Sequence, residues 1–191
     1  MSYVLGKMIF IHIPKCGGHT VLEEMKRHGG FRMKDRWEGG AWSCHPTASA
    51  LKERMGAEWD SYEKVTVVRE PRERAVGLFE LKMKGQALDL FHFSRYMHKM
   101  KGRSSFRFNP WTVQSRFLLP EVKVFRLDQI ERLWEFMEEM HGIEIGKVQA
   151  VNSYLKPVVA RRWDWRKLYS QEMWQMMTAR HRGVLEQFGW E

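Results

Sequence analysis

Short apolar runs alternate with amphipathic stretches along most of this chain. Met8–Ile13, Lys64–Arg69 and Glu121–Arg126 are rich in isoleucine or valine, which is typical of short buried strands. Apolar residues recur at helical spacing in the segments that predict helices, which are Thr20–Arg27, Thr47–Met55, Pro71–Lys84, Leu88–Met100, Ile130–His141 and Trp165–Phe188, the last forming one helix or two. The stretch Phe31–Ser43 has no clear period and predicts an irregular loop.

The order of these elements predicts the fold class. Strands that alternate with helices are joined by right-handed crossovers, which makes the strands parallel and puts helices on both faces. We therefore expect an α/β fold of three layers, with a short central parallel sheet flanked by helices. The chain has 191 residues, of which 43% are hydrophobic, and this fits a single domain, residues 1–191. In such a fold, ligands bind at the carboxyl ends of the strands.

The positive net charge of the chain favours an anionic partner but does not identify it. Lys and Arg number 32 against 23 Asp and Glu, so the net charge is +9. Nucleic acid, acidic glycan, anionic lipid and nucleotide all fit this charge, and so does a surface that is merely solvated. Two cysteines are too few for a disulfide-stapled secreted scaffold, and no stretch approaches the roughly 18 apolar residues of a membrane helix. No signal-peptide pattern is present, so we expect a cytoplasmic protein without a membrane span.

The segment from Pro14 to Thr20 lies between a predicted strand and a predicted helix, where backbone amides and the helix dipole hold phosphate. Gly17 and Gly18 allow a close backbone approach, and Lys15 supplies a mobile cation. The lysine precedes the glycines and the upstream glycine of a Walker A sequence is absent, which disfavours a nucleoside triphosphatase or nucleotide kinase. The alternative is a turn that needs glycine for its geometry alone.

The run from Phe10 to Thr20 reads Phe-Ile-His-Ile-Pro-Lys-Cys-Gly-Gly-His-Thr. It resembles the 5′-phosphosulfate loop of sulfotransferases that use 3′-phosphoadenosine-5′-phosphosulfate (PAPS), especially the carbohydrate-type, sulfotransferase family 2-like branch. That branch commonly has threonines where this chain has Cys16 and His19. The resemblance implies a P-loop-like fold and a set of donor-binding residues, namely Lys15, Cys16, Gly17, Gly18, His19, Thr20 and Val21.

A second segment, Val67 to Phe79, resembles the family's 3′-phosphate element. In that element an arginine ends a strand, and a serine follows eight positions later. Arg69 matches the arginine, whose guanidinium can bind a phosphate bidentately. Gly77 stands in the place of the serine, so one hydroxyl contact of the family is missing. The two elements occur in the family's order, and the resemblance continues to the Phe188-Gly-Trp tail.

The resemblance implies transfer of a sulfuryl group from PAPS to an acceptor hydroxyl by direct in-line displacement, with carbohydrate as the favoured acceptor and Lys15 stabilising the leaving oxygen. His45 is the candidate base, because the branch often carries a histidine there and histidine titrates near neutrality. His19 is the rival base. No metal is expected, since Cys44 and His45 have no second pair at ligand spacing.

Two other functions stay open at this point. A protein of the same fold that binds PAPS or its product nucleotide without turnover would account for Cys16, His19 and Gly77 at positions that are usually polar contacts. A nucleic-acid-binding module would rest on net charge alone, and we do not expect it. The expected partners are the nucleotide donor and a hydroxyl acceptor, and the sequence leaves the oligomeric state open.

Overall fold

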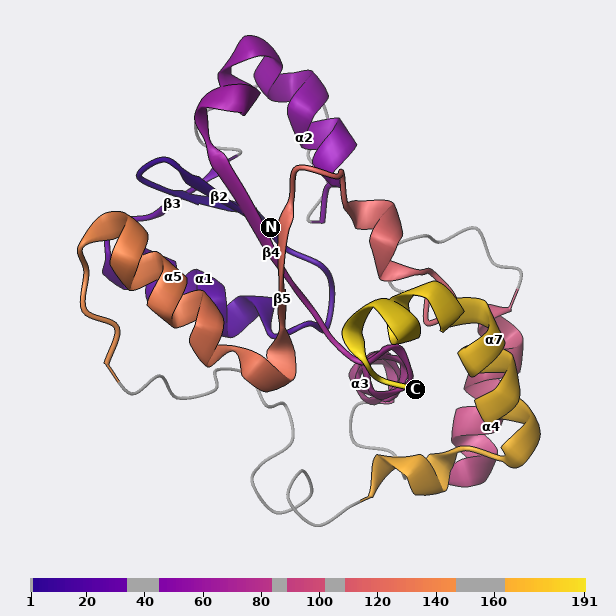
Figure 1. Cartoon of the computed structure of the whole chain (residues 1–191). Coiled ribbons are helices and arrows are strands. Elements are labelled where there is room, and N and C mark those ends of the chain that lie inside the picture. The colour runs from indigo at the N-terminus through magenta and orange to yellow at the C-terminus, as the bar shows by residue number, and fades with distance from the viewer. Residues whose placement is uncertain (1, 34–44, 84–88, 102–108, 147–163) are drawn as a thin grey trace. The chain divides into compact units, whose positions relative to one another are not determined.

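The computed structural model describes residues 2–33, 45–83, 89–101, 109–146 and 164–191 (Figure 1). The chain divides into two compact units. Unit 1 comprises residues 1–68 and 115–152, and unit 2 comprises residues 69–114 and 153–191. The chain therefore enters unit 2, returns to unit 1, and ends in unit 2. The single domain expected from the sequence stays a prediction.

A five-stranded sheet forms the centre of unit 1. Its strands are β1 (Tyr3–Leu5), β2 (Met8–Ile11), β3 (Phe31–Arg32), β4 (Glu63–Val68) and β5 (Lys123–Arg126), in the order β3-β1-β2-β4-β5. The three predicted strands are confirmed as β2, β4 and β5, which pair in parallel. The sheet as a whole is mixed rather than parallel, because β1 pairs antiparallel with both β2 and β3. The stretch expected to be an irregular loop from Phe31 thus begins with a short edge strand, and residues 34–44 lie outside the described residues.

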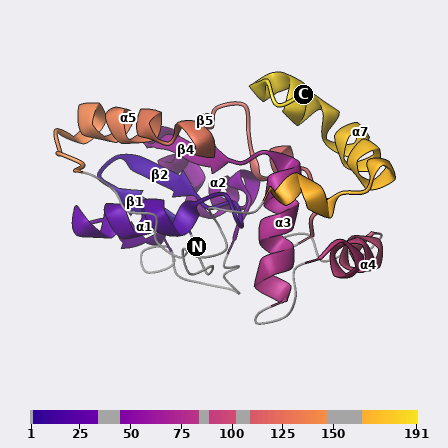
Figure 2. The same ribbon diagram turned by 90° about the horizontal axis from the view of Figure 1, so that it is seen from below.

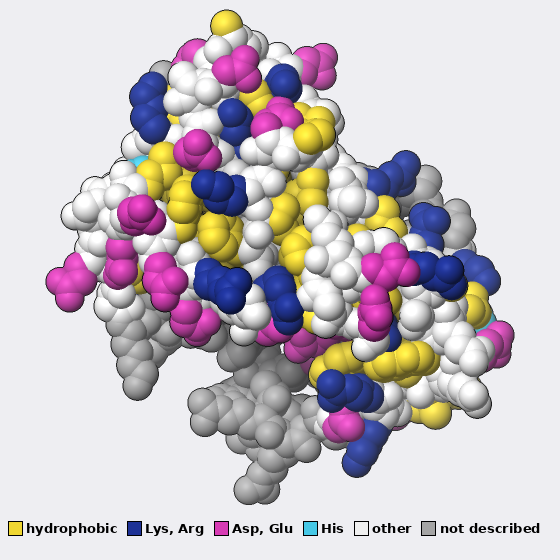
Figure 3. All heavy atoms as spheres, viewed as in Figure 1, with side chains coloured by type: hydrophobic (Ala, Val, Ile, Leu, Met, Phe, Trp, Pro, Cys, Tyr) yellow, Lys and Arg dark blue, Asp and Glu magenta, His cyan; other side chains and the backbone are white. Residues whose placement is uncertain are grey.

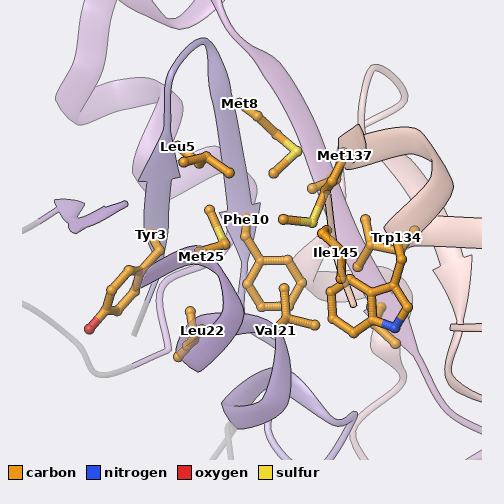
Figure 4. Close-up of a cluster of buried hydrophobic side chains, with 13 residues drawn as sticks. Tyr3, Leu5, Met8, Phe10, Val21, Leu22, Met25, Trp134, Met137 and Ile145 are labelled. Atoms are coloured by element: carbon orange, nitrogen blue, oxygen red, sulfur yellow. The ribbon is translucent and has the colours of Figure 1, made fainter. Parts of the chain in front are cut away.

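Helices cover both faces of this sheet, as the sequence predicts. On one face α1 (Gly18–Arg27) and α5 (Glu131–His141) bury a cluster in which Phe10 of β2 packs with Val21 and Met25 of α1 and with Met137 of α5 (Figure 4). Successive strand residues point to opposite faces, so the neighbours of Phe10 face the other layer.

The second face of the sheet is covered by α2 (Ala48–Met55) and the 3-10 helix η2 (Gly56–Ser61). Ile9 and Ile11 of β2 are buried there with Leu51 of α2 and Trp59 of η2. Short 3-10 helices η3 (Gln114–Phe117) and η4 (Leu127–Gln129) flank β5 along the chain. The α/β class with helices on both faces is therefore confirmed for unit 1.

Unit 2 consists of α3 (Pro71–Lys82), α4 (Leu90–Met100), the 3-10 helix η5 (Trp165–Leu168) and α7 (Gln171–Phe188). Within this unit α3 contacts α4, η5 and α7 (Figure 2). Their shared core is apolar and includes two aromatic side chains in contact, Phe79 and Phe93.

Capping residues set the helix boundaries in both units. Thr47, Asp89 and Ser170 each accept a hydrogen bond from the backbone amide three residues later, at the start of α2, α4 and α7. Pro71 opens α3 at a position where its missing amide has no intrahelical role. None of the helices in the described part of the chain is both long and apolar enough to cross a membrane.

Candidate functional site

A tight turn joins β2 to α1 and contains the predicted donor-binding residues. Lys15 has a φ of 66° and Gly17 a φ of 76°, so the turn places a lysine in the left-handed region of the backbone. For a residue with a side chain, this conformation costs of order 1 kcal/mol and clusters at functional sites. Hydrogen bonds from the Cys16 amide to the Ile13 carbonyl, at 3.4 Å, and from the Thr20 amide to the Gly17 carbonyl, at 3.0 Å, close the turn. The fold thus holds the half-buried Lys15 between a parallel strand and a helix N-terminus.

The packing of the turn explains both of its glycines. A Cβ atom at Gly17 would lie 2.4 Å from Cδ1 of Leu127, and a Cβ atom at Gly18 would lie 2.0 Å from Cδ2 of His12. The first contact involves the end of a flexible side chain, whereas the second involves a buried imidazole ring. The glycines are therefore required by local packing in addition to any approach of a ligand.

The first turn of α1 presents backbone amides and the positive end of the helix dipole. Gly17 is the N-cap, so the amides of Gly18 and His19 lie where an α-helix has no carbonyl to accept them. Val21 lies one turn further along, and its side chain is buried in the core of unit 1. The described geometry therefore favours the amides at the start of α1 over that of Val21 as anion ligands.

Cys16 does not present its side chain as the family's threonine would. Its thiol is buried, and Sγ lies 3.7 Å from the carbonyl oxygen of Pro14, to which it donates. The thiol therefore stabilises the turn, and a contribution of Cys16 to an anion site would come from its backbone.

Three histidines meet beside this turn. The ring of His12 contacts that of His45, with centroids 4.5 Å apart, and that of His19, with centroids 5.4 Å apart; both pairs are edge-on. His12 and His45 are buried, and His19 is exposed. The structure therefore brings both candidate bases to the same turn as Lys15.

His12 lies beside both candidate bases, and the sequence pattern did not single it out because it predicted a strand extending to Ile13. β2 ends at Ile11, so His12 is the first residue after the strand. A polar residue at the carboxyl end of an apolar strand is the signal that could have identified it.

A hydrogen bond fixes the protonation pattern of His45. Its Nδ1 atom lies 3.1 Å from the backbone carbonyl oxygen of His12. A carbonyl oxygen only accepts hydrogen bonds, so Nδ1 carries the proton. In the neutral imidazole the lone pair then resides on Nε2, which is the arrangement of a general base.

The electrostatic surroundings of His19 keep it neutral. Desolvation lowers the pKa of His19 below its usual 6.5, and the positive charge of Lys15 lowers it further. A neutral imidazole at pH 7 can accept a proton, so His19 keeps the chemistry required of a base.

Arg69 lies in unit 2 and follows directly after β4. Its backbone amide donates to Oε1 of Gln114 at 3.0 Å, and its carbonyl accepts from Nε2 of Gln114 at 2.6 Å. Its guanidinium Nη2 donates to the Glu73 carboxylate at 2.9 Å. Gln114 is buried and was not predicted as a site residue; it fixes the backbone of Arg69, while Glu73 competes with an anion for the guanidinium.

Gly77, in the position of the family's serine, is buried within α3. Among the residues that the structure describes, no group of three or more His, Cys, Asp or Glu side chains could hold a metal ion. Cys44, the partner considered for His45 in a metal site, lies outside the described residues.

Comparison of the chain with protein-family models, with curated proteins and with solved structures gave no match.

Proposed function

We propose that the chain is a PAPS-dependent sulfotransferase of P-loop-like fold that transfers a sulfuryl group to an acceptor hydroxyl, with a carbohydrate as the favoured acceptor. The observation that carries this proposal is the left-handed Lys15 between β2 and the N-terminus of α1, beside His12, His19 and His45. A cation and a helix N-terminus together suit an anionic leaving group, and a neutral histidine suits a hydroxyl nucleophile.

The donor's phosphosulfate is a dianion that needs several hydrogen-bond donors. Amides at the start of α1 and the ammonium group of Lys15 supply them without reorganisation, because the turn is already formed. Negative charge grows on the bridging oxygen as the sulfur–oxygen bond breaks. The ammonium group stabilises that charge, which lowers the barrier.

The acceptor oxygen attacks sulfur in line with the leaving phosphate. One sulfur–oxygen bond forms and one breaks, which yields a sulfate ester and adenosine 3′,5′-bisphosphate (PAP). The acceptor's proton passes to an imidazole, for which Nε2 of His45 is our candidate and His19 the rival. Arg69 would bind the 3′-phosphate of the nucleotide, for which its guanidinium must exchange Glu73 for the ligand.

A second function, nucleotide binding without turnover, is favoured by two contacts. The thiol of Cys16 is buried against Pro14, and the guanidinium of Arg69 is already paired with Glu73. Both features reduce the number of side chains that can hold the donor in its reactive geometry. This protein would bind PAP and release no sulfate ester.

The test is transfer of labelled sulfate from PAPS to a panel of glycans, lipids and phenols, with PAP affinity measured on the same sample. We expect transfer by the parent and a loss of about 10²- to 10³-fold in Lys15→Ala. Lys7→Ala is the matched control, because Lys7 is an exposed lysine in the turn between β1 and β2. PAP binding without transfer to any acceptor would establish the second function, and absence of PAP binding would refute both.

A further inference from the structure

Helix α4 exposes large apolar side chains together with positive charges. Among the described residues, the large apolar side chains that are exposed are Phe31, Leu90 and Phe91, and the last two begin α4 with 45% and 69% of their surface accessible. Phe93 and Met97, which follow Leu90 at i+3 and i+7, are buried in the core of unit 2. Leu90 therefore continues the inward-packing row of α4 at its exposed first turn, whereas Phe91 points away from that row.

The exposed side of α4 is basic. Phe91, Arg95, His98 and Lys99 are spaced at i, i+4, i+7 and i+8, which places them on one face of the helix. Arg95, His98 and Lys99 are exposed, as is Lys101 just after the helix. One face of α4 thus combines an aromatic side chain with several cations.

The charge of this segment is unusual within the chain. From residue 90 to residue 120 the sequence contains six Lys or Arg residues and no Asp or Glu. On the face drawn in Figure 3, by contrast, positive and negative side chains are interspersed. Asp89, the N-cap of α4, pairs with His92 at 2.7 Å. Three of these cations, Arg95, Lys99 and Lys101, lie on α4 or directly after it.

We propose that the exposed start of α4, Leu90 and Phe91, together with the basic side chains of Arg95, His98, Lys99 and Lys101, binds the surface of an anionic lipid membrane. Aromatic and aliphatic side chains enter the boundary between headgroups and acyl chains, while Lys and Arg attract anionic headgroups. A soluble polyanion would use the cations alone and would leave Leu90 and Phe91 in water. The exposed apolar pair is the observation that favours lipid, and this inference is independent of the proposed sulfuryl transfer.

The whole chain can be tested by flotation with vesicles of phosphatidylcholine alone and of phosphatidylcholine mixed with phosphatidylserine. We expect binding to the mixed vesicles only. A double variant, Arg95→Gln with Lys99→Gln, should bind them roughly 30-fold more weakly, because each cation near the surface contributes about fivefold. The matched control is Arg54→Gln with Arg132→Gln, which removes the same charge from exposed positions on α2 and α5 and should bind as the parent does.

Phe91→Ser distinguishes a membrane from a soluble polyanion. It should weaken vesicle binding about tenfold or more, because burying a phenyl ring contributes about 1.5–3 kcal/mol, and it should leave binding to heparin or a single-stranded oligonucleotide unchanged. Parent-like vesicle binding by Phe91→Ser, or no difference between the two vesicle compositions, would overturn the proposal. Equal losses in the double variant and its control would overturn it as well.

Discussion

The histidine cluster at the end of β2 places the two candidate bases, His45 and His19, in different surroundings. The carbonyl of His12 fixes Nδ1 of His45 as a donor, and the ring of His12 contacts the rings of both His45 and His19. A base whose tautomer is fixed by a backbone carbonyl loses no free energy in selecting the correct protonation state. This is the physical reason to prefer His45 over His19 as the proton acceptor.

We predict that His45→Ala retains PAP affinity while single-turnover transfer falls by about 10²- to 10⁴-fold, the usual effect of removing a general base. The measurement is quenched-flow transfer from PAPS, with PAP affinity by calorimetry on the same sample. His28→Ala is the control, because His28 is a partly buried histidine at the end of α1 that pairs with Glu24.

His19→Ala separates the two candidate bases. If this variant loses transfer and His45→Ala does not, His19 is the base. The acidic limb of kcat/KM would then lie below pH 6.5, because the lowered pKa of His19 keeps its imidazole neutral at lower pH.

At the residue scale, sequence reasoning singled out residues that the structure brings together, but it did not predict the contacts between them. Lys15, Gly17, Gly18 and His19 were singled out from their positions around a strand-to-helix turn, and His45 was singled out from the family resemblance. The contact between His12 and His45 joins residues 33 positions apart and depends on how the segment before α2 packs against the end of β2. The spacing of apolar residues along the chain carries no information on such a contact, because neither histidine is part of an apolar pattern.

At the start of α1, the packing of the His12 ring requires a residue without a side chain at position 18. We predict that Gly18→Ala lowers the free energy of unfolding by about 1–3 kcal/mol, because the new Cβ atom would meet the buried His12 ring at 2.0 Å. Urea unfolding monitored by tryptophan fluorescence measures this change. A stability equal to that of the parent would mean that the His12 ring moves away at no cost.

Gly183→Ala is the matched control at this scale. Gly183 lies inside α7, and nothing lies within 4 Å of the position of its Cβ. Alanine has the higher helix propensity, so this variant should gain about 0.5–1 kcal/mol. Opposite signs for the two glycines would show that packing, rather than backbone freedom, decides the effect at Gly18.

Helix α7 carries a buried histidine, His181. Burial lowers the pKa of His181 to about 4, and the charge of Arg74 adds to this effect. In the unfolded chain the pKa is near 6.5, so the unfolded state binds the proton first as the pH falls. The stability is complete above pH 6.5 and decreases as the pH falls toward 4.

We therefore predict that the parent loses about 2 kcal/mol of stability between pH 7.5 and pH 5 that His181→Leu does not lose. Chemical unfolding of both proteins at the two pH values measures this loss. Subtracting the loss of the variant from that of the parent removes the contribution of every other titrating group. The same pH dependence in both proteins would show that His181 titrates normally.

At the element scale, the sequence predicted the helix boundaries, which local patterns determine. Thr47, Asp89 and Pro71 mark helix starts within two residues of the predicted ones, because caps and proline act locally. The β1 strand was missed because three residues are too few for a periodic signal. β1 pairs with β2 in a hairpin closed by the two-residue turn Gly6–Lys7, whereas the pairing of β3 with β1 joins segments on either side of α1, which the local pattern does not encode.

At the scale of the whole molecule, the two predicted phosphate elements belong to different units. Lys15 and the start of α1 are in unit 1, whereas Arg69 opens unit 2 directly after β4. The strand order predicted that β2 and β4 run in the same direction, and their parallel pairing is confirmed. The 3′-phosphate proposed to bind Arg69 distinguishes PAP from AMP, so comparing these two nucleotides tests the second element by itself.

We predict that PAP raises the melting temperature more than AMP, which has no 3′-phosphate. A ligand at about 100 times its Kd adds about 2.7 kcal/mol to the free energy of unfolding. For a chain of this size that corresponds to roughly 5–10 °C.

Arg69→Ala should reduce the shift caused by PAP to that caused by AMP, because the guanidinium is the proposed partner of the 3′-phosphate. Arg54→Ala, which removes an exposed arginine from α2, should leave the difference intact. Equal shifts with PAP and AMP in the parent would exclude a 3′-phosphate site, whereas an unchanged difference in Arg69→Ala would assign that site to another residue.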